Sequence, residues 1–169
     1  MTPPPSAATP NDAAAIVRFR DRVRSRTGTA ELFVFRLGDE RFAFDLRAIE
    51  EVLENAEVAP LPDAPRAVSG VCRHDGAMLV VVRADALLGV DSLRASTVLV
   101  MRRGDDRLGV LVEDVEDVEQ VDLTALRNPP HATDDLLLAV LWADGRLTSV
   151  LDARAMVSAG AALLQRGAA

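Results

Sequence analysis

The feature of this chain that most restricts its possible folds is an internal repeat. Shifting the sequence by 66 positions superposes seven identical residues without a gap. The seven pairs are Val34/Val100, Arg36/Arg102, Gly38/Gly104, Asp39/Asp105, Arg41/Arg107, Glu50/Glu116 and Val52/Val118. A second match, at a shift of 69, places Gly76 over Gly145 and superposes the apolar residues that follow. The 169 residues therefore contain two similar halves, and each half is too short to be comfortably stable alone.

The repeated segments have the residue pattern of β-strands. Apolar residues alternate with other residues on both sides of a Gly-containing turn at 37–40, which predicts a hairpin from segments 31–36 and 41–46. Further strands are expected at 77–83, 97–102, 108–112, 137–142 and 147–151. Short strands separated by turn residues, taken with the repeat, predict two similar small β-barrels that share an interface. The groove between two such barrels is a natural docking surface for another protein.

The N-terminal part differs in composition from the repeated part. Residues 1–12 are rich in Pro, Ala, Ser and Thr, and we expect them to form a disordered lead. Residues 13–27 contain five arginines, and Ile16, Phe19 and Val23 recur there at helical spacing. This segment predicts a basic amphipathic helix. Its apolar stripe either rests on the protein's own barrel or docks, with its charges, on an acidic partner.

The charge balance excludes some classes of partner. The net charge of −7 argues against nucleic-acid binding, because an acidic chain repels phosphate backbones. No apolar run approaches the roughly 20 residues that span a bilayer, and the N-terminus lacks the pattern of a signal peptide. We therefore expect a cytoplasmic protein without direct membrane insertion.

The reactive residues do not assemble a recognisable catalytic or metal centre. One cysteine, Cys72, and two histidines, His74 and His131, cannot supply a disulfide framework or a structural zinc site with four N/S ligands. His74 and Asp75 lie between two apolar stretches before Gly76, which favours a polar turn over half of a catalytic dyad. Cys72 is expected to pack as a small buried hydrophobic residue.

A cluster of acidic residues follows the second hairpin. It consists of Glu113, Asp114, Glu116, Asp117 and Glu119. A valine recurs at every third position from Val112 to Val121, which favours a solvated edge over buried valines rather than a calcium loop. Trp142 lies in an apolar strand and is expected to belong to the core. The sequence therefore predicts no catalytic residue, no cofactor and no metal site.

The order of the motifs resembles the CheW-like domain of bacterial chemotaxis coupling proteins. The resemblance is carried by segments 31–43 (ELFVFRLGDERFA), 49–52 (IEEV), 61–65 (LPDAP), 70–71 (GV), Gly76, 108–113 (LGVLVE) and 151–153 (LDA). It covers residues 30–157, which we take as a CheW-like domain of two pseudo-repeated subdomains. Residues 158–169 are then left as a C-terminal tail.

The resemblance implies a mainly β fold of two SH3-like five-stranded barrel subdomains, with an N-terminal helix and short helical tails. It implies a non-enzymatic adaptor that couples the cytoplasmic tip of a chemoreceptor, a methyl-accepting chemotaxis protein, to the regulatory domain of a CheA-type histidine kinase. Such a protein is cytoplasmic and associates with receptor arrays at the membrane. By resemblance, the receptor-binding groove falls on Ile49, Glu51, Val52, Gly70, Asp75, Val115 and Val118.

The chain departs from the usual family pattern just before Gly76. Asn-Leu-Arg-Gly is usual there, whereas this chain has Arg73-His74-Asp75-Gly76, which replaces a positive charge by a negative one. Glu51 and Asp75 would repel each other if they were neighbours, unless Arg73 supplies a partner. This altered surface leaves open an accessory CheW-like protein that binds receptors or a scaffold without activating the kinase. A small hydrolase or ligand-binding barrel would instead require a pocket with converging polar groups.

Overall fold

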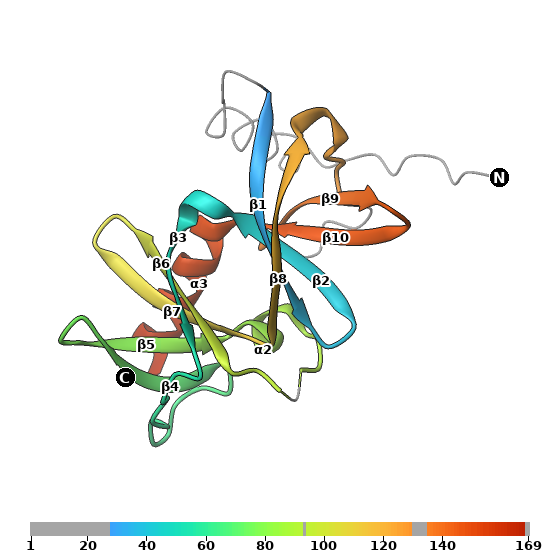
Figure 1. Cartoon of the computed structure of the whole chain (residues 1–169). Helices are drawn as coiled ribbons and strands as arrows, with labels where there is room; N and C mark the ends of the chain where they lie inside the picture. The colour runs from blue at the N-terminus through green and yellow to red at the C-terminus, as the bar shows by residue number, and fades with distance from the viewer. Residues whose placement is uncertain (1–27, 93, 130–134, 168–169) are drawn as a thin grey trace.

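The computed structural model describes residues 28–92, 94–129 and 135–167, which form two five-stranded sheets with a helix packed across them (Figure 1). The predicted mainly β fold of two five-stranded subdomains is therefore confirmed. The predicted lead at 1–12, the predicted basic helix at 13–27 and His131 lie outside the described residues. Within the described ranges, the helices are too short or too polar to cross a membrane.

The elements of the two sequence halves follow the same order. The first half contains β1 (Thr29–Leu37), β2 (Glu40–Asp45), the 3-10 turn η1 (Leu46–Ala48), β3 (Ile49–Glu54), β4 (Val68–His74), β5 (Ala77–Arg83) and helix α2 (Ala84–Leu88). The second half contains β6 (Thr97–Arg103), β7 (Asp106–Val112), β8 (Asp114–Asp122), the 3-10 turn η2 (Leu123–Ala125), β9 (Leu137–Ala143), β10 (Arg146–Leu151) and helix α3 (Ala153–Gly167). All seven predicted strands are present, and β3, β4 and β8 add to them.

The two halves exchange strands, so one half of the sequence is not one barrel. The strand order is β8-β1-β2-β10-β9 in the first sheet and β3-β6-β7-β5-β4 in the second. Each sheet therefore combines a hairpin from one half with three strands from the other. Neither subdomain has its five strands without both halves of the chain, so the two halves are interleaved in one domain.

The register of the exchanged strands follows the repeat. On β3, Ile49 and Val52 lie opposite Met101 and Leu99, while on β8 the repeat mates Val115 and Val118 lie opposite Phe35 and Phe33. In both strands the register shifts by one residue between these positions. A strand normally alternates its faces every residue, and a bulge resets the alternation. The bulge therefore brings apolar residues that are three positions apart onto one face.

Ion pairs between the two halves account for three of the seven repeated identities. Glu116 lies 2.9 Å from Nε of Arg41 and 3.8 Å from Nε of Arg36. The repeat mates form the same triad, because Glu50 lies 2.9 Å from atoms of both Arg102 and Arg107. In each triad the glutamate of the bulged strand comes from one half of the chain and the arginines from the other. These repeated ion pairs therefore link β8 to the β1–β2 hairpin and β3 to the β6–β7 hairpin.

The main core lies where the two sheets meet. Phe35 is fully buried, and its ring stacks on those of Phe42 and Phe44, with centroid separations of 6.0 and 5.3 Å. The same apolar cluster includes Leu99 and Met101 of the second sheet. Smaller clusters lie within each sheet. The largest apolar cluster therefore joins the subdomains rather than filling one of them.

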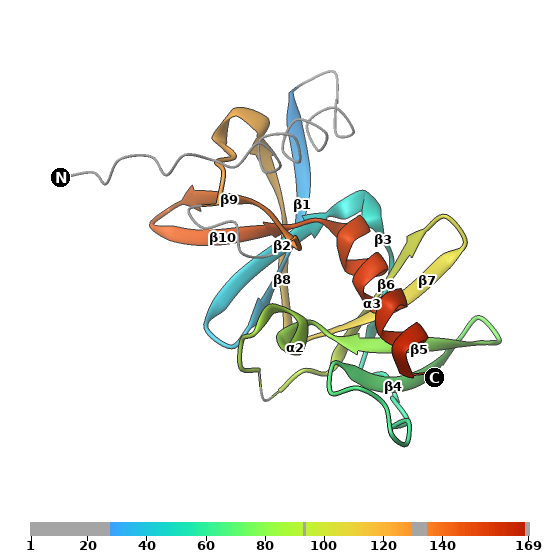
Figure 2. The same cartoon turned by 180° about the vertical axis from the view of Figure 1, so that it is seen from behind.

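Helix α3 covers this core and is longer than the sequence pattern predicted. Figure 2 shows it lying across the junction of the sheets, and its Met156 and Val157 are buried in the main cluster. A Cβ atom on Gly160 would lie 2.5 Å from the side chain of Leu108, so the helix packs tightly on β7. Residues 158–167 thus continue the helix beyond position 157, the predicted end of the domain. The Ala-rich segment stays helical because one face packs on the core.

Gly70 allows the loop at residues 59–60 to sit directly against β4. Its φ angle is 152°, and a Cβ atom there would lie 2.0 Å from the carbonyl oxygen of Ala59. Ala59 and Val71 hold this contact by a pair of backbone hydrogen bonds of 2.8 and 2.9 Å. Any side chain at this position must therefore push the loop away from the strand.

We expect Gly70→Ala to lower the free energy of unfolding by about 3 kcal/mol, because it combines a strained backbone angle with a steric clash. Gly76→Ala is the matched control. Gly76 also has a positive φ angle, of 76°, but a Cβ atom on it would meet no other atom within 4 Å, so the strain alone should cost about 1 kcal/mol. Urea denaturation of both variants measures the difference, and equal losses would contradict the proposed clash.

Candidate protein-docking surface

The four apolar residues predicted for the groove lie on the strands that end the two sheets. β3 and β8 are edge strands of their sheets, and Figure 1 shows them on either side of the region where the sheets meet. Ile49 and Val52 on β3 pack partly buried against the main core. On β8, Val115 is 38% exposed and Val118 is 43% exposed. We call these four residues the inter-sheet seam.

The exposure of the seam valines corrects one prediction. The valines of the acidic segment were expected beneath a solvated edge, but only Val112 is fully buried. The bulge in β8 turns Val115 and Val118 together onto the face of Phe33 and Phe35, at the open edge of the sheet. Val115 and Val118 therefore form a short apolar strip that is open to solvent between acidic residues.

Two acidic residues of β8, Glu116 and Glu119, bind an arginine of β2. Arg41 binds Glu119 as well as Glu116, each at 2.9 Å. Burial acts to lower the pKa of Arg41, but its hydrogen bonds to these two carboxylates outweigh burial and raise the pKa. Among the described residues, the acidic side chains of β8 do not gather into a set of three cation ligands.

A polar cluster of Glu51, His74 and Asp75 lies beside the β3 strand of the seam. Nε2 of His74 is hydrogen-bonded to the carboxylate of Glu51 and lies 3.6 Å from Oδ2 of Asp75. Asp75 also lies 3.8 Å from a guanidinium nitrogen of Arg107. The structure therefore brings Glu51 and Asp75 together, with Nε2 of His74 and a guanidinium nitrogen of Arg107 beside their carboxylates.

The segment before Gly76 differs from the sequence analysis at two residues. The sequence left open whether Arg73 pairs with the two carboxylates, and in the described part of the chain it makes no ion pair with either. His74 was expected in a polar turn, but it ends β4 and is buried. Positions 68, 70, 72 and 74 all face inward in β4, so His74 continues an inward-facing row. That alternation is the signal that could have identified it.

The remaining predicted groove residues have different settings. Gly70 is buried beneath Ala59 and Pro60, so it shapes the backbone of β4. Asp75 occupies the exposed turn between β4 and β5 with a φ angle of 51°. Cys72 is a buried free cysteine, as predicted, and burial raises the pKa of its thiol.

Trp142 is an exposed residue that sequence reasoning missed. It was expected in the core, but its side chain is 66% exposed on β9, opposite the exposed Leu147 of β10. The β9–β10 hairpin extends beyond the core before it turns at Asp144 and Gly145. At a shift of 69, Trp142 corresponds to Arg73, which is also exposed. The polar repeat mate Arg73 was therefore the signal in the sequence that Trp142 is exposed.

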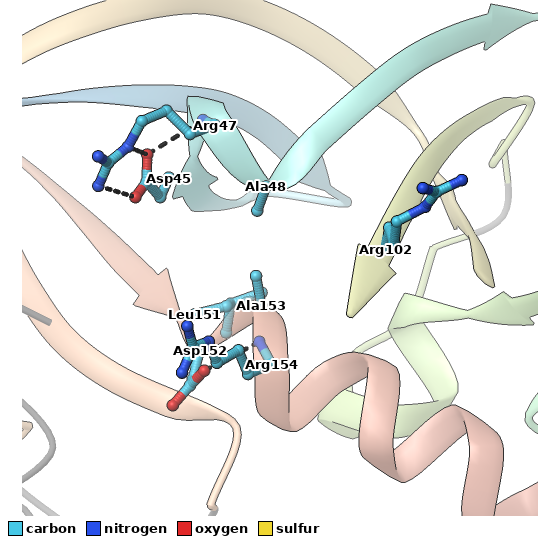
Figure 3. Close-up of a pocket in the computed structure, with 8 residues that line it drawn as sticks. All are labelled: Asp45, Arg47, Ala48, Arg102, Leu151, Asp152, Ala153 and Arg154. Atoms are coloured by element: carbon cyan, nitrogen blue, oxygen red, sulfur yellow. Dashed lines mark hydrogen bonds and ion pairs between the residues drawn. The ribbon is translucent and has the colours of Figure 1, made fainter. Parts of the chain in front are cut away.

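A pocket of about 370 Å³ lies between η1 and the start of α3 (Figure 3). Four of its charged side chains are paired within the fold or cap helix α3. Asp45 binds Arg47 at 3.1 Å, Arg102 binds Glu50 at 2.9 Å, and the carboxylate of Asp152 accepts hydrogen bonds from backbone N–H groups at the start of α3. These groups do not converge on a common point, so the pocket lacks the arrangement that a hydrolase or ligand-binding barrel requires.

Comparisons with known proteins agree with the observed fold. A family model described as the CheW-like domain matches residues 31–161. The chemotaxis protein CheW of Rhizobium meliloti (strain 1021) is 29% identical over 132 residues, which cover 74% of this chain and 85% of the relative. The chemotaxis protein CheW of Thermotoga maritima is 30% identical over 129 residues, covering 72% and 83%. FrzA of Myxococcus xanthus is 28% identical over 126 residues, covering 71% and 79%.

A solved structure supports the same arrangement of strands. The crystal structure of the scaffolding protein TtCheW from Thermoanaerobacter tengcongensis superposes with a TM-score of 0.67 at 19% sequence identity. The superposition covers 73% of this chain and 88% of that chain.

Proposed function

Because this chain belongs to the CheW-like domain family, we propose that it is a non-enzymatic adaptor that couples chemoreceptor tips to a CheA-type histidine kinase. The observation that carries the proposal is the inter-sheet seam, where equivalent apolar residues of both repeats lie on the edge strands of the two sheets. The adaptor acts by position: it holds receptor and kinase in a fixed geometry and shifts the population of active kinase. Its place is the cytoplasm, at receptor arrays.

The receptor tip occupies the seam in this proposal. Such a tip is a helical hairpin, and a helix can lay an apolar stripe along a strip of exposed valines. The contact residues are Ile49, Glu51, Val52, Asp75, Val115 and Val118, with Gly70 shaping β4 behind them. The exposed carboxylates of Glu51, Asp75 and Asp117 favour a receptor helix with basic residues beside its apolar stripe.

A coupling protein needs a second face for the kinase regulatory domain. The β9–β10 hairpin supplies a candidate, because it points away from β3 in Figure 1 and exposes Trp142 and Leu147 at cross-strand positions. Tryptophan is enriched among the residues that dominate protein interfaces. We therefore assign the kinase contact to this hairpin.

The alternative is an accessory protein that binds receptors without activating the kinase. The observation that favours it is the polar cluster, because Asp75 places a negative charge where the family usually has an arginine. Both functions use the seam, so receptor binding alone does not separate them.

Reconstituted kinase activity separates the two functions. Receptor cytoplasmic fragments and kinase are mixed with increasing amounts of the protein, and kinase autophosphorylation is measured. We expect activity to rise severalfold, because a coupler increases the fraction of kinase held in the receptor complex. Trp142→Ala should abolish the rise while leaving receptor binding intact. A second mixture also contains a standard adaptor. A fall in kinase activity there identifies the accessory protein. If the protein changes kinase activity in neither mixture, both proposed functions are contradicted.

A further inference from the structure

We propose that Glu51, His74 and Asp75 form a binding site for a divalent transition-metal ion of the zinc type. One ligand atom from each side chain lies within 4.8 Å of the other two. The ligands come from three places that the fold brings together: β3, the end of β4 and the turn that follows. The proposal is independent of the proposed adaptor function, because it concerns only the binding of the ion.

The chemistry of the three ligands selects the class of ion. An imidazole nitrogen and two carboxylate oxygens suit zinc, cobalt(II) or nickel(II), whereas calcium and magnesium prefer ligand sets made entirely of oxygen. The sequence excludes a closed zinc site of four Cys or His ligands, but this set is different. Three protein ligands leave a coordination position open for water or for a group from another molecule.

The geometry is close to that of a bound ion. Ligand atoms around a tetrahedral zinc ion lie about 3.3 Å apart, given bonds of about 2.0 Å. Nε2 of His74 already lies 3.6 Å from Oδ2 of Asp75. The carboxylate of Glu51 lies closer, in a hydrogen bond to Nε2, so it must move outward to admit an ion. The Glu51 and Asp75 side chains are 50% and 69% exposed, which leaves both carboxylates room to rotate. Small side-chain movements surround an ion, and the proton of the His74–Glu51 hydrogen bond is released to water as the Nε2 lone pair binds the metal.

Burial holds the imidazole in the orientation that the site needs. The His74 side chain is 5% exposed, and its Nδ1 is buried without a hydrogen-bond partner among the described residues. Nε2 is therefore the ring nitrogen that faces the two carboxylates. Because no acceptor supports Nδ1 and the fourth ligand is missing, we expect reversible binding that is weaker than in a closed structural zinc site.

The charges around the cluster favour binding of a cation. Two carboxylates face one imidazole, and Arg107 is the nearest guanidinium, 3.8 Å from Asp75. Arg107 already makes two hydrogen bonds to Glu50, at 2.9 and 3.2 Å, so it can turn from Asp75 and keep its main partner. An ion at the cluster would then neutralise Glu51 and Asp75 directly.

The repeat supplies an internal comparison for the ligand set. At a shift of 69, His74 and Asp75 correspond to Ala143 and Asp144. Asp75 and Asp144 have nearly the same φ angle, 51° and 52°, at the start of an Asp-Gly turn. The second hairpin thus forms the same turn without a histidine or a ligand cluster, so the turn does not require the cluster. Asp144→Asn is therefore a matched control for Asp75→Asn.

Metal titration of the full-length protein tests the site. The protein is treated with a chelator and then titrated with zinc against a chromophoric chelator, and separately with cobalt(II), whose visible absorption reports its ligands. We expect one ion per chain and a cobalt spectrum without a thiolate charge-transfer band. His74→Gln and Asp75→Asn should each weaken binding at least about tenfold, whereas Asp144→Asn and His131→Gln should leave it unchanged.

A second variant keeps the test decisive if the buried histidine variant does not fold. Asp75 is exposed, so Asp75→Asn tests the site on a folded protein, and far-ultraviolet circular dichroism checks each variant. The proposal is overturned if the wild-type protein does not compete with the chelator for zinc. It is also overturned if Asp75→Asn and Asp144→Asn bind zinc equally, or if binding is lost with His131→Gln instead.

Discussion

Replacing Val115 and Val118 together by aspartate is expected to weaken binding of a receptor cytoplasmic fragment by about a hundredfold or more. In the complex, the two valines of the seam lose contact with water, so the variant gives up apolar burial. It also places two carboxylates, without counter-charges, in an interface from which water is excluded. Together these effects amount to roughly 3 kcal/mol, and each 1.4 kcal/mol corresponds to a factor of ten in affinity.

The double variant should remain folded, because the two positions are already 38% and 43% exposed on an edge strand. Charged residues are common on edge strands, and β8 already carries several. Calorimetric titration with the receptor fragment measures the affinity, and thermal unfolding checks the fold. Trp142→Ala is the matched control, since it removes an exposed apolar side chain away from the seam and should leave receptor affinity unchanged. A folded double variant with wild-type affinity would place the receptor contact elsewhere.

The sequence predicted the strands that keep a regular alternation of faces. The hairpins β1–β2 and β6–β7 and the strands β5, β9 and β10 were all expected within a few residues. β3 and β8 were not expected, because their bulges at Glu50 and Glu116 change the apolar spacing from two to three. The same spacing, taken as a solvated edge over buried valines, concealed the exposure of Val115 and Val118.

The exchange of strands could not be predicted from the repeat. A repeat shows which segments are equivalent, but it does not show whether a segment pairs with its own copy or with the other one. The charges contained partial information, because Glu50 and Glu116 recur with their arginines. Only the structure shows that each glutamate binds the arginines of the other half.

The errors at His74 and Trp142 have opposite causes. His74 belongs to an inward-facing row of β4, so its place in the strand outweighs its polar character. Trp142 lies near the tip of a hairpin that extends beyond the core, so its place outweighs its apolar character. In both positions the local residue type was a poorer guide than the repeat mate or the strand register. The seven groove residues came from family resemblance, and their role in receptor binding remains a prediction.

Phe35→Ala is expected to lower the free energy of unfolding by about 4 kcal/mol, the usual range for a buried phenylalanine. Its ring is fully buried, stacks on Phe42 and Phe44, and belongs to the cluster that contains Leu99 and Met101 of the other sheet. The loss of this side chain therefore removes contacts within the first sheet and between the sheets.

Because the halves exchange strands, we expect Phe35→Ala to lower the stability of both subdomains. Cys72, the single cysteine, is buried on β4 in the second sheet, so its alkylation reports the opening of the subdomain that does not contain Phe35. If the domain unfolds as one unit, and alkylation is slow relative to reclosing, its rate follows the population of open molecules. A loss of about 4 kcal/mol should then raise the rate of Cys72 alkylation by about a thousandfold.

Leu61→Ala, at an exposed loop position, should leave the rate of Cys72 alkylation unchanged. The contrary outcome is a Phe35→Ala protein that is less stable by circular dichroism but whose Cys72 is alkylated as slowly as in the wild type. That result would show that the subdomains open separately, which the shared core and the exchanged strands do not allow.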